Sequence, residues 1–301
     1  MNVAEAKSEL KRLLSRLRPA ELTQLLGWMK NSDELEDELL GDNGRVLLQS
    51  IAEDLRANVA PDAMLACETA AYSKMQRRSR PTVHVDGFLY DDEQVDSLCE
   101  RGLMSRNYCL SCGSHRTAPL DFISHSFSVT ELRFLFQHVL PDLSGRTLVD
   151  VGSRLGAVLY GGYVYSSASR LLGLEISEGF VRLQDSMLHK YKLTDRVQVL
   201  QADVCTQDVL LQNADVVVMN NVFEYFMEPE QQVRAWKFIV QNFRKKGSLL
   251  VTVPSLHESL NPLQEVLQPD WVEELPINYD VYLGRDTDPD ALRQIHLYRV
   301  I

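Results

Sequence analysis

Hydrophobic residues follow different patterns in the two halves of this chain. Up to about residue 75, leucines recur three or four positions apart, for example Leu10, Leu13 and Leu17, as in amphipathic helices. From Phe127 onward, short apolar runs alternate with amphipathic stretches of ten or more residues, which is typical of strands covered by helices on both faces. We therefore expect a helical N-terminal domain (1–80), a connector (81–126) and an α/β domain (127–301).

Two segments of the N-terminal half predict interruptions. The stretch GDNG at 41–44 is rich in turn-forming residues, and we expect it to break a helix. The basic segment KMQRRSRP at 74–81 marks a boundary near Arg80. It is either a solvated linker or a docking patch for nucleic acid or an acidic partner. The connector that follows is expected to hold a short strand, at Val83 and Val85, and one helix.

Five short apolar runs in residues 127–301 predict strands. Because helical stretches separate them, they imply right-handed βαβ units. The expected fold class is α/β, with a Rossmann-like open, mostly parallel sheet and helices on both faces. Two late runs, WVEELPINYDVYLG and IHLYRVI, are expected to add a strand pair, so that the chain ends inside the sheet. The five runs are RTLVDVG, RLLGLEIS, RVQVLQADV, ADVVVMNNVF and GSLLVTVPS.

Candidate chemistry begins where the first run ends, because ligands of such sheets bind beyond the carboxyl ends of the strands. Asp150 is followed by a loop with Gly152 and Gly156, in which the backbone can approach a ligand closely. The middle slot of this loop is a glycine in dinucleotide-binding loops, but here it is Arg154. A pyrophosphate needs that glycine, so Arg154 argues against an NAD-dependent oxidoreductase.

Acidic and amide residues end the next three strands. Glu175 follows Gly152 by about 20 positions, where an acidic residue accepts hydrogen bonds from the ribose hydroxyls of an adenine nucleoside. Asp203 ends the third run, and its carboxylate suits the exocyclic amine of adenine. The fourth run ends in the turn-forming pair Asn220 and Asn221.

In their order and spacing these segments resemble the class I S-adenosylmethionine-dependent methyltransferases. VDVGSRLG is similar to the family's first motif except at Arg154. LGLEIS, QADV and ADVVVMNNVFEYF are similar to the second, third and fourth motifs, and FRKKGSLLVTVPS resembles the segment before the fifth strand. The resemblance covers residues 127–301 and implies S-adenosyl-L-methionine as cofactor. It assigns these residues to the cofactor: Asp150, Gly152, Ser153, Arg154, Gly156, Glu175, Ile176, Asp203, Val204 and Asn220.

The resemblance also implies which part of the cofactor each of these residues contacts. It places the glycine loop against the methionine part, the second strand end against the ribose and adenine, and the third strand end against the adenine edge. Asn220 is expected near the reactive methyl group. For Arg154 there are two interpretations, a partner of the methionine carboxylate or an exposed loop arginine. The segment FISHSFSVTEL, ahead of the first strand, is expected to close over the cofactor.

The catalytic group is unknown from the sequence. A sulfonium already activates its methyl group, so catalysis is mostly alignment of a nucleophile, and a base is needed only if the nucleophile must lose a proton. Asn221, Glu224 and Tyr225 are candidates, but VFEYF equally predicts the start of a helix that packs on the sheet. The alternative to an active enzyme is a cofactor-binding scaffold or regulatory partner. Its interface would be the helical N-terminal domain.

Composition and missing motifs limit the class of methyl acceptor and the cellular compartment that we expect. The DPPY and NPPF motifs and the proline–cysteine nucleophile pair of nucleic-acid base methyltransferases are absent, and the net charge is −11. Both argue against a nucleic-acid acceptor, so we expect a small molecule or a protein side chain. Neither a signal peptide nor a membrane span is expected. The few scattered cysteines favour reduced thiols in the cytoplasm or nucleus.

One cysteine pair resembles half of a zinc site. NYCLSCGSH at 107–115 contains Cys109 and Cys112, but a structural zinc needs four ligands. Cys99, His115 or His125 would have to complete the set. Free or buried thiols are the alternative interpretation, and we expect no metal.

Overall fold

In a computed structural model of the chain, the described residues fall into two units, Met1–Leu47 and Leu48–Ile301. The structure describes residues 8, 11–18, 21, 22, 25, 33–59, 86–102, 126–224, 227–265, 268, 270–282 and 289–301.

The described part of the first unit consists of helix and turn, as expected. Helix α3 (Asp33–Asn58) runs without interruption through 41–44, so the expected break at GDNG is wrong. Glycine within a helix costs about 1 kcal/mol relative to alanine. In the second unit, however, Leu48, Ile51 and Leu55 of the same helix are fully buried, and tertiary packing of this kind outweighs local propensity.

The second unit is built on a seven-stranded sheet with the order β3-β2-β1-β4-β5-β7-β6. Strands β1 to β5 are parallel, and β7 runs antiparallel to both β5 and β6. The expected fold class is confirmed, as is the late strand pair with the chain ending inside the sheet. The strands are β1 Thr147–Val151, β2 Arg170–Glu175, β3 Val197–Gln201, β4 Val216–Asn220, β5 Leu249–Val253, β6 Val272–Leu275 and β7 His296–Val300.

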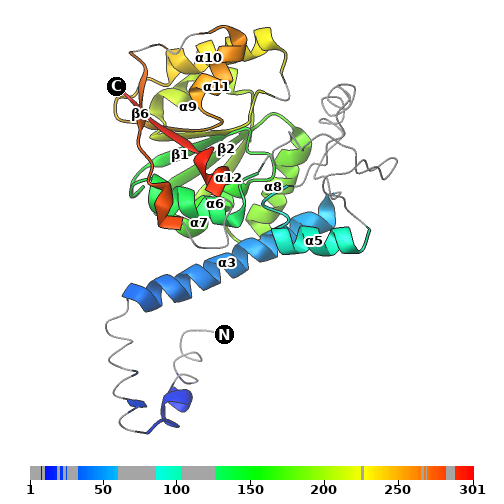
Figure 1. Cartoon of the computed structure of the whole chain (residues 1–301), viewed down its shortest axis with the longest axis vertical. Coiled ribbons are helices and arrows are strands. Elements are labelled where there is room, and N and C mark those ends of the chain that lie inside the picture. Colours follow the sequence, from blue (N-terminus) through cyan, green and yellow to red (C-terminus); the bar gives the residue numbers. More distant parts are fainter. Residues whose placement is uncertain are drawn as a thin grey trace. The chain divides into compact units, whose positions relative to one another are not determined.

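Helices cover both faces of this sheet, with α9, α10 and α11 on one side and α6, α7 and α8 on the other (Figure 1). None of the described helices is long and apolar enough to cross a membrane. The helical elements of this unit beyond α3 are α5 Asp92–Glu100, α6 Val129–Phe134, the π-helix η1 Leu135–Val139, α7 Ala157–Tyr165, α8 Glu178–Lys190, η2 Val204–Thr206, α9 Asp208–Asn213, α10 Pro229–Asn242, α11 Leu256–Leu260, η3 Asn261–Leu263, η4 Tyr279–Tyr282 and α12 Pro289–Arg293.

A cluster of buried residues joins the sheet to α10. Trp236 and Ile239 of this helix share a buried cluster with Leu250 of β5 and Trp271, which lies just before β6. Trp271 is fully buried, and its Nε1 donates a hydrogen bond to the carbonyl oxygen of Phe243 at 2.9 Å. This contact fixes the end of α10 to the start of the antiparallel strand pair.

The connector contributes helix α5 and a buried turn before it. Helix α5 begins at a capping box in which the Asp91 carboxylate accepts from the backbone N–H of Gln94 at 2.8 Å. Arg56 of α3 donates to the carbonyl oxygen of Leu89 and to Oε1 of Gln94. The helix expected in this segment is therefore present. The strand at Val83 and the boundary near residue 80 lie outside the described residues and stay predictions.

Candidate cofactor site

The loop between β1 and α7 turns through three residues with positive φ. These are Gly152 (φ 72°), Arg154 (φ 47°) and Gly156 (φ 88°). The backbone N–H groups of Gly152 and Ser153 both donate to the carbonyl oxygen of Leu174, at 2.8 and 3.1 Å. The loop is therefore bound to the end of the neighbouring strand β2.

Position 156 accepts only glycine, for two reasons. Its φ of 88° is unfavourable for any residue with a Cβ. In addition, a Cβ there would lie 2.7 Å from Cζ and 2.8 Å from the hydroxyl oxygen of Tyr160. Tyr160 is itself fully buried, with its ring centroid 5.9 Å from that of Phe88. The first turn of α7 is thus held against a tyrosine that cannot move aside into solvent.

Arg154 occupies the middle slot of the loop and adopts a backbone conformation typical of glycine. Its side chain is buried, with 7% of the residue exposed. The guanidinium Nη1 lies 2.9 Å from Oδ2 of Asp86, and the guanidinium carbon lies 5.2 Å from the centroid of the Phe180 ring. The interpretation of Arg154 as an exposed loop residue is therefore wrong. Its partner in this structure is Asp86, which the sequence pattern did not single out.

A small cavity of about 20 Å³ lies among the loop, the strand ends and the segment before α6. It has room for about one water molecule. Asp150, Ser153 and Asn220 contribute to its wall from the sheet side, and Ser126 and Phe127 contribute from the segment before α6. The cavity also touches Gly152 and Arg154. The structure thus brings five of the predicted cofactor residues together around one space.

Asp150 is the strongest electrostatic feature of this cavity. It is buried, and this burial raises the pKa of its carboxyl well above the ordinary value, with the nearby Glu175 as a second cause. Within the described part of the chain, no cation pairs with Asp150, and the buried Oγ of Ser153 has no hydrogen-bond partner. A carboxylate and a hydroxyl in this state suit a ligand that brings a positive charge and a hydrogen-bonding group.

Glu175 joins the loop to the end of β2. Its Oε2 accepts from the backbone N–H of Arg154 at 2.9 Å, and its Oε1 accepts from that of Ser177 at 2.8 Å. The next residue, Ile176, is 66% exposed. An exposed aliphatic side chain beside this carboxylate leaves an open apolar face, as packing against an adenine ring requires.

The end of β3 lies beside the end of β2. The backbone N–H of Ala202 donates to the carbonyl oxygen of Glu175 at 3.0 Å. Oδ1 of Asp203 accepts from the backbone N–H of Cys205 at 2.8 Å and begins η2. Val204 is buried in the core beside α10, so only its backbone is placed to meet a ligand edge.

The loop after β4 is irregular in the described residues 221–224, and α10 begins at Pro229. Residues 225 and 226 lie outside the described residues, so the alternative of a helix starting in VFEYF stays a prediction. Asn221 has φ 49°, is buried, and donates from Nδ2 to Oδ1 of Asn220 at 2.9 Å. Oε1 of Glu224 accepts from the Ser259 hydroxyl of α11 at 2.8 Å. Glu224 is therefore held toward α11, and Tyr225 lies outside the described residues.

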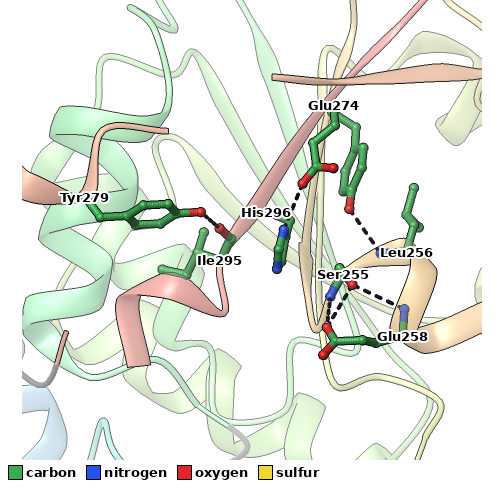
Figure 2. Close-up of polar contacts among 8 residues, drawn as sticks. Ser255, Leu256, Glu258, Glu274, Tyr279, Ile295 and His296 are labelled. Carbon is green, nitrogen blue, oxygen red and sulfur yellow. Dashed lines mark hydrogen bonds and ion pairs between the residues drawn. The ribbon is translucent and has the colours of Figure 1, made fainter. Parts of the chain in front are cut away.

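A polar cluster at the end of β5 was not predicted from the sequence. Figure 2 shows Glu274 of β6 pointing to His296 of β7, with Oε1 and Nδ1 2.9 Å apart. On the other side of His296, Ser255 and Glu258 form the capping box of α11, and these hydrogen bonds lower the pKa of Glu258. We call Ser255, Glu258, Glu274 and His296 the β5-end cluster.

Strand register places the β5-end cluster at the ligand-binding edge of the sheet. Asn220 pairs with Val253, and Thr252 pairs with His296. Neighbouring strands are about 4.8 Å apart, so His296 lies about 10 Å across the sheet from Asn220. Alternation along the last run predicts that His296 and Tyr298 lie on one face of a strand. The pairing of that strand, β7, with β5 has no local sequence signal.

The cysteine pair cannot be placed. Cys109, Cys112, His115 and His125 lie outside the described residues, and only Cys99 of α5 is described. Among the described residues, no group of three or more potential ligands is arranged for a metal. The question of zinc stays a prediction.

Comparison with known proteins identifies the segment that carries this loop. Residues 149–251 match the family model described as a methyltransferase domain. This match spans the first four motifs, β1 to β4, and most of β5. No curated protein sequence matches the chain.

Solved structures with a similar arrangement include three methyltransferases. An RNA methyltransferase from Salinibacter ruber in complex with S-adenosyl-L-homocysteine is 16% identical, with 57% of this chain and 88% of that chain covered and a TM-score of 0.36. The O-methyltransferase from Bacillus cereus in complex with S-adenosyl-L-homocysteine is 16% identical, with coverages of 60% and 84% and a TM-score of 0.42. An rRNA methylase from Streptococcus thermophilus is 13% identical, with coverages of 57% and 93% and a TM-score of 0.37.

Proposed function

We propose that this chain, whose residues 149–251 match a methyltransferase domain, is a class I, S-adenosylmethionine-dependent methyltransferase and binds that cofactor at the loop after β1. We propose further that it transfers the methyl group to a small molecule or a protein side chain. The observation that carries the proposal is the buried carboxylate of Asp150 on the wall of the cavity, next to a loop with a positive φ at both glycines. The proposal is supported by charge, by the residues at the strand ends and by the position of the loop at the start of a helix.

Charge favours S-adenosylmethionine over a dinucleotide. The methionine end of the cofactor carries an ammonium group and a carboxylate, and its sulfur is a cation. Asp150 suits the ammonium group, and the N-terminus of α7, at Ala157, suits the carboxylate. The pyrophosphate of NAD would instead approach the carboxylates of Asp150 and Glu175. Like charges at short distance in a buried site are strongly unfavourable.

The residues present fit the cofactor in kind, while the cavity has to widen to admit it. Glu175 lies where a ribose would be held, and the exposed Ile176 lies beside it. The cavity of about 20 Å³ is lined on one side by Ser126 and Phe127, so its walls have to move apart to admit the cofactor. We propose that the segment before α6 is the part that moves, as expected for FISHSFSVTEL.

When bound, the cofactor supplies an activated methyl group, and the chain has to place an acceptor in line with it. Asn220 and Asn221 contribute amide groups at the end of β4. The β5-end cluster adds a histidine and two carboxylates at the same edge of the sheet. We assign these groups to the acceptor side, where they would orient the nucleophile and exclude competing water.

Methyl transfer from S-adenosylmethionine with a radiolabelled methyl group tests the proposed function. The full chain would be incubated with separated small-molecule, protein and RNA pools, and label would be counted in each. We expect label in the small-molecule or protein pool, and we expect its loss in Asp150→Asn. Label in the RNA pool would contradict the acceptor class. Cofactor binding without label in any pool would favour the scaffold alternative over the enzyme.

A further inference from the structure

We propose that Asp86 is a positioning residue for the cofactor, acting through Arg154 on the loop after β1. Asp86 lies outside the segment that matches the methyltransferase domain. Affinity for S-adenosylmethionine would then depend on the connector as well as on the domain itself. This inference rests on the proposed function, because it assumes that the loop binds the cofactor.

Four hydrogen bonds hold the Asp86 carboxylate in one orientation. The residue is 0% exposed. Its Oδ1 accepts from the backbone N–H groups of Phe88 and Leu89, at 3.0 and 3.1 Å. Its Oδ2 accepts from the Ser126 hydroxyl at 2.7 Å and from Nη1 of Arg154 at 2.9 Å. A buried carboxylate with both oxygens occupied is a fixed anchor for the arginine.

Arg154 needs such an anchor, because its charge is buried while its backbone is strained. A φ of 47° is unfavourable for a residue with a Cβ. A buried guanidinium without a counter-ion would be driven toward water, and the loop would have to leave its position to let it go. With Asp86 in place, Arg154 stays, and its backbone N–H donates to Oε2 of Glu175. Arg154 therefore connects Asp86 to Glu175, whose carboxylate is proposed to hold the ribose.

The same carboxylate also fixes the opposite wall of the cavity. Ser126 lines the cavity and donates to Asp86, whereas Arg154 lines it from the loop side. Asp86 thus bonds to both sides of the space where the methionine end is expected. We call Asp86, Ser126 and Arg154 the Asp86 tie. The contact with Arg154 holds the conformation of the loop, and the contact with Ser126 has to break or move with the segment before α6 when the cofactor enters.

A pair of substitutions separates this positioning role from simple stabilisation. Asp86→Asn keeps the shape of the side chain but removes the negative charge that faces the buried Arg154 guanidinium. We expect S-adenosylmethionine to bind at least tenfold more weakly to this variant. Arg154→Gly combined with Asp86→Asn removes both charges and gives the loop a residue that adopts positive φ freely. Because Asp86 acts through Arg154, we expect the double variant to bind within threefold of Arg154→Gly alone.

Calorimetric titration of the full chain with S-adenosylmethionine is the test, with circular dichroism to verify folding of each variant. The control is Asp54→Asn, because Asp54 pairs with Lys190 at 2.5 Å and connects α3 to α8 through a partly exposed ion pair away from the loop. We expect this control to bind as wild type does. If Asp86→Asn alone fails to fold, Arg154→Gly takes its place: weaker binding than wild type, with no further loss in the double variant, supports the inference.

Two results would overturn the inference while leaving the proposed function intact. One is wild-type affinity in a folded Asp86→Asn variant. The other is a folded double variant that binds at least tenfold more weakly than folded Arg154→Gly. Wild-type chain that binds no S-adenosylmethionine would instead overturn the proposed function, and the inference with it.

Discussion

The buried carboxylate of Asp150 makes the stability of the folded chain depend on pH. Burial and the charge of Glu175 raise its pKa, so the folded state keeps the proton at pH values where the unfolded chain has released it. The unfolded pKa is about 4, and the folded pKa lies above it. The free energy of unfolding therefore decreases as pH rises through this window, from the unfolded pKa to the folded one.

Asp150→Asn should separate stability from binding. The amide keeps the shape of the side chain and cannot ionise, so we expect a higher melting temperature than wild type at pH 7 and a smaller difference near pH 4. We also expect affinity for S-adenosylmethionine to fall by about tenfold or more, as for the loss of a hydrogen bond to a charged group. Thermal unfolding at both pH values and calorimetry check this. A variant less stable than wild type at pH 7 would contradict the electrostatic account.

The affinity of the wild-type chain should itself depend on pH. A bound ammonium group favours the ionised form of Asp150, so binding releases a proton wherever the free carboxyl is protonated. Affinity should rise with pH until the raised pKa of Asp150 is passed. Between pH 5 and about 7 the ammonium group stays charged, which makes this the interval to titrate. Asp150→Asn should remove the slope.

A substitution at Gly156 tests whether the stability of the fold depends on the geometry of the loop. Gly156→Ala adds the cost of a positive φ, about 1–2 kcal/mol, and that of a Cβ 2.7 Å from the Tyr160 ring, about 1–3 kcal/mol. Gly145 has a similar φ of 76° but open space around its Cβ, so Gly145→Ala carries the first cost alone. Denaturant unfolding should show the larger loss for Gly156→Ala. Equal losses would mean that the contact with Tyr160 is unimportant.

The strands and most helices of the α/β unit could be predicted because each is specified by its own residues. Runs such as ADVVVMNNVF have a continuous apolar centre, and β4 is buried on both faces. The break expected at GDNG failed because packing of Leu48 and Ile51 in the same helix overrides the preference of two glycines. Local sequence therefore predicted the elements whose structure depends on their own residues. It failed where packing against other segments determines the structure.

Helix α11 begins at a cap that should contribute measurably to stability. The Ser255 hydroxyl accepts from the backbone N–H of Glu258, and the Glu258 carboxylate accepts from the backbone N–H of Ser255. Ser255→Ala removes the first bond, and we expect the free energy of unfolding to fall by about 1 kcal/mol. Denaturant unfolding measures it. Ser144→Ala, in a loop at the opposite end of the sheet, is the control for loss of an exposed serine.

Strand β7 brings His296 to the acceptor side of the proposed site. His296→Ala removes the partner of Glu274 without touching the loop after β1. We expect turnover with the labelled acceptor pool to fall at least tenfold while affinity for S-adenosylmethionine changes less than twofold. Unchanged turnover would remove the β5-end cluster from the acceptor side.

Across the whole chain, the parts of the candidate site differ in how far sequence could find them. The glycine loop, Asp150 and Glu175 follow strands at regular spacing, so motif order was enough to select them. Asp86 and His296 reach the same edge of the sheet from distant segments, through a buried ion pair and an antiparallel pairing. Neither contact leaves a local pattern, because each is specified jointly by two segments far apart in the sequence.

The loop after β1 is proposed to bind S-adenosylmethionine rather than a dinucleotide. Calorimetric titration of the full chain with S-adenosylmethionine, S-adenosyl-L-homocysteine and NAD distinguishes these ligands. We expect micromolar binding of the first two, weakened in Asp150→Asn, and no binding of NAD. Binding of NAD, or binding of none of the three, would show that the loop is not a site for S-adenosylmethionine.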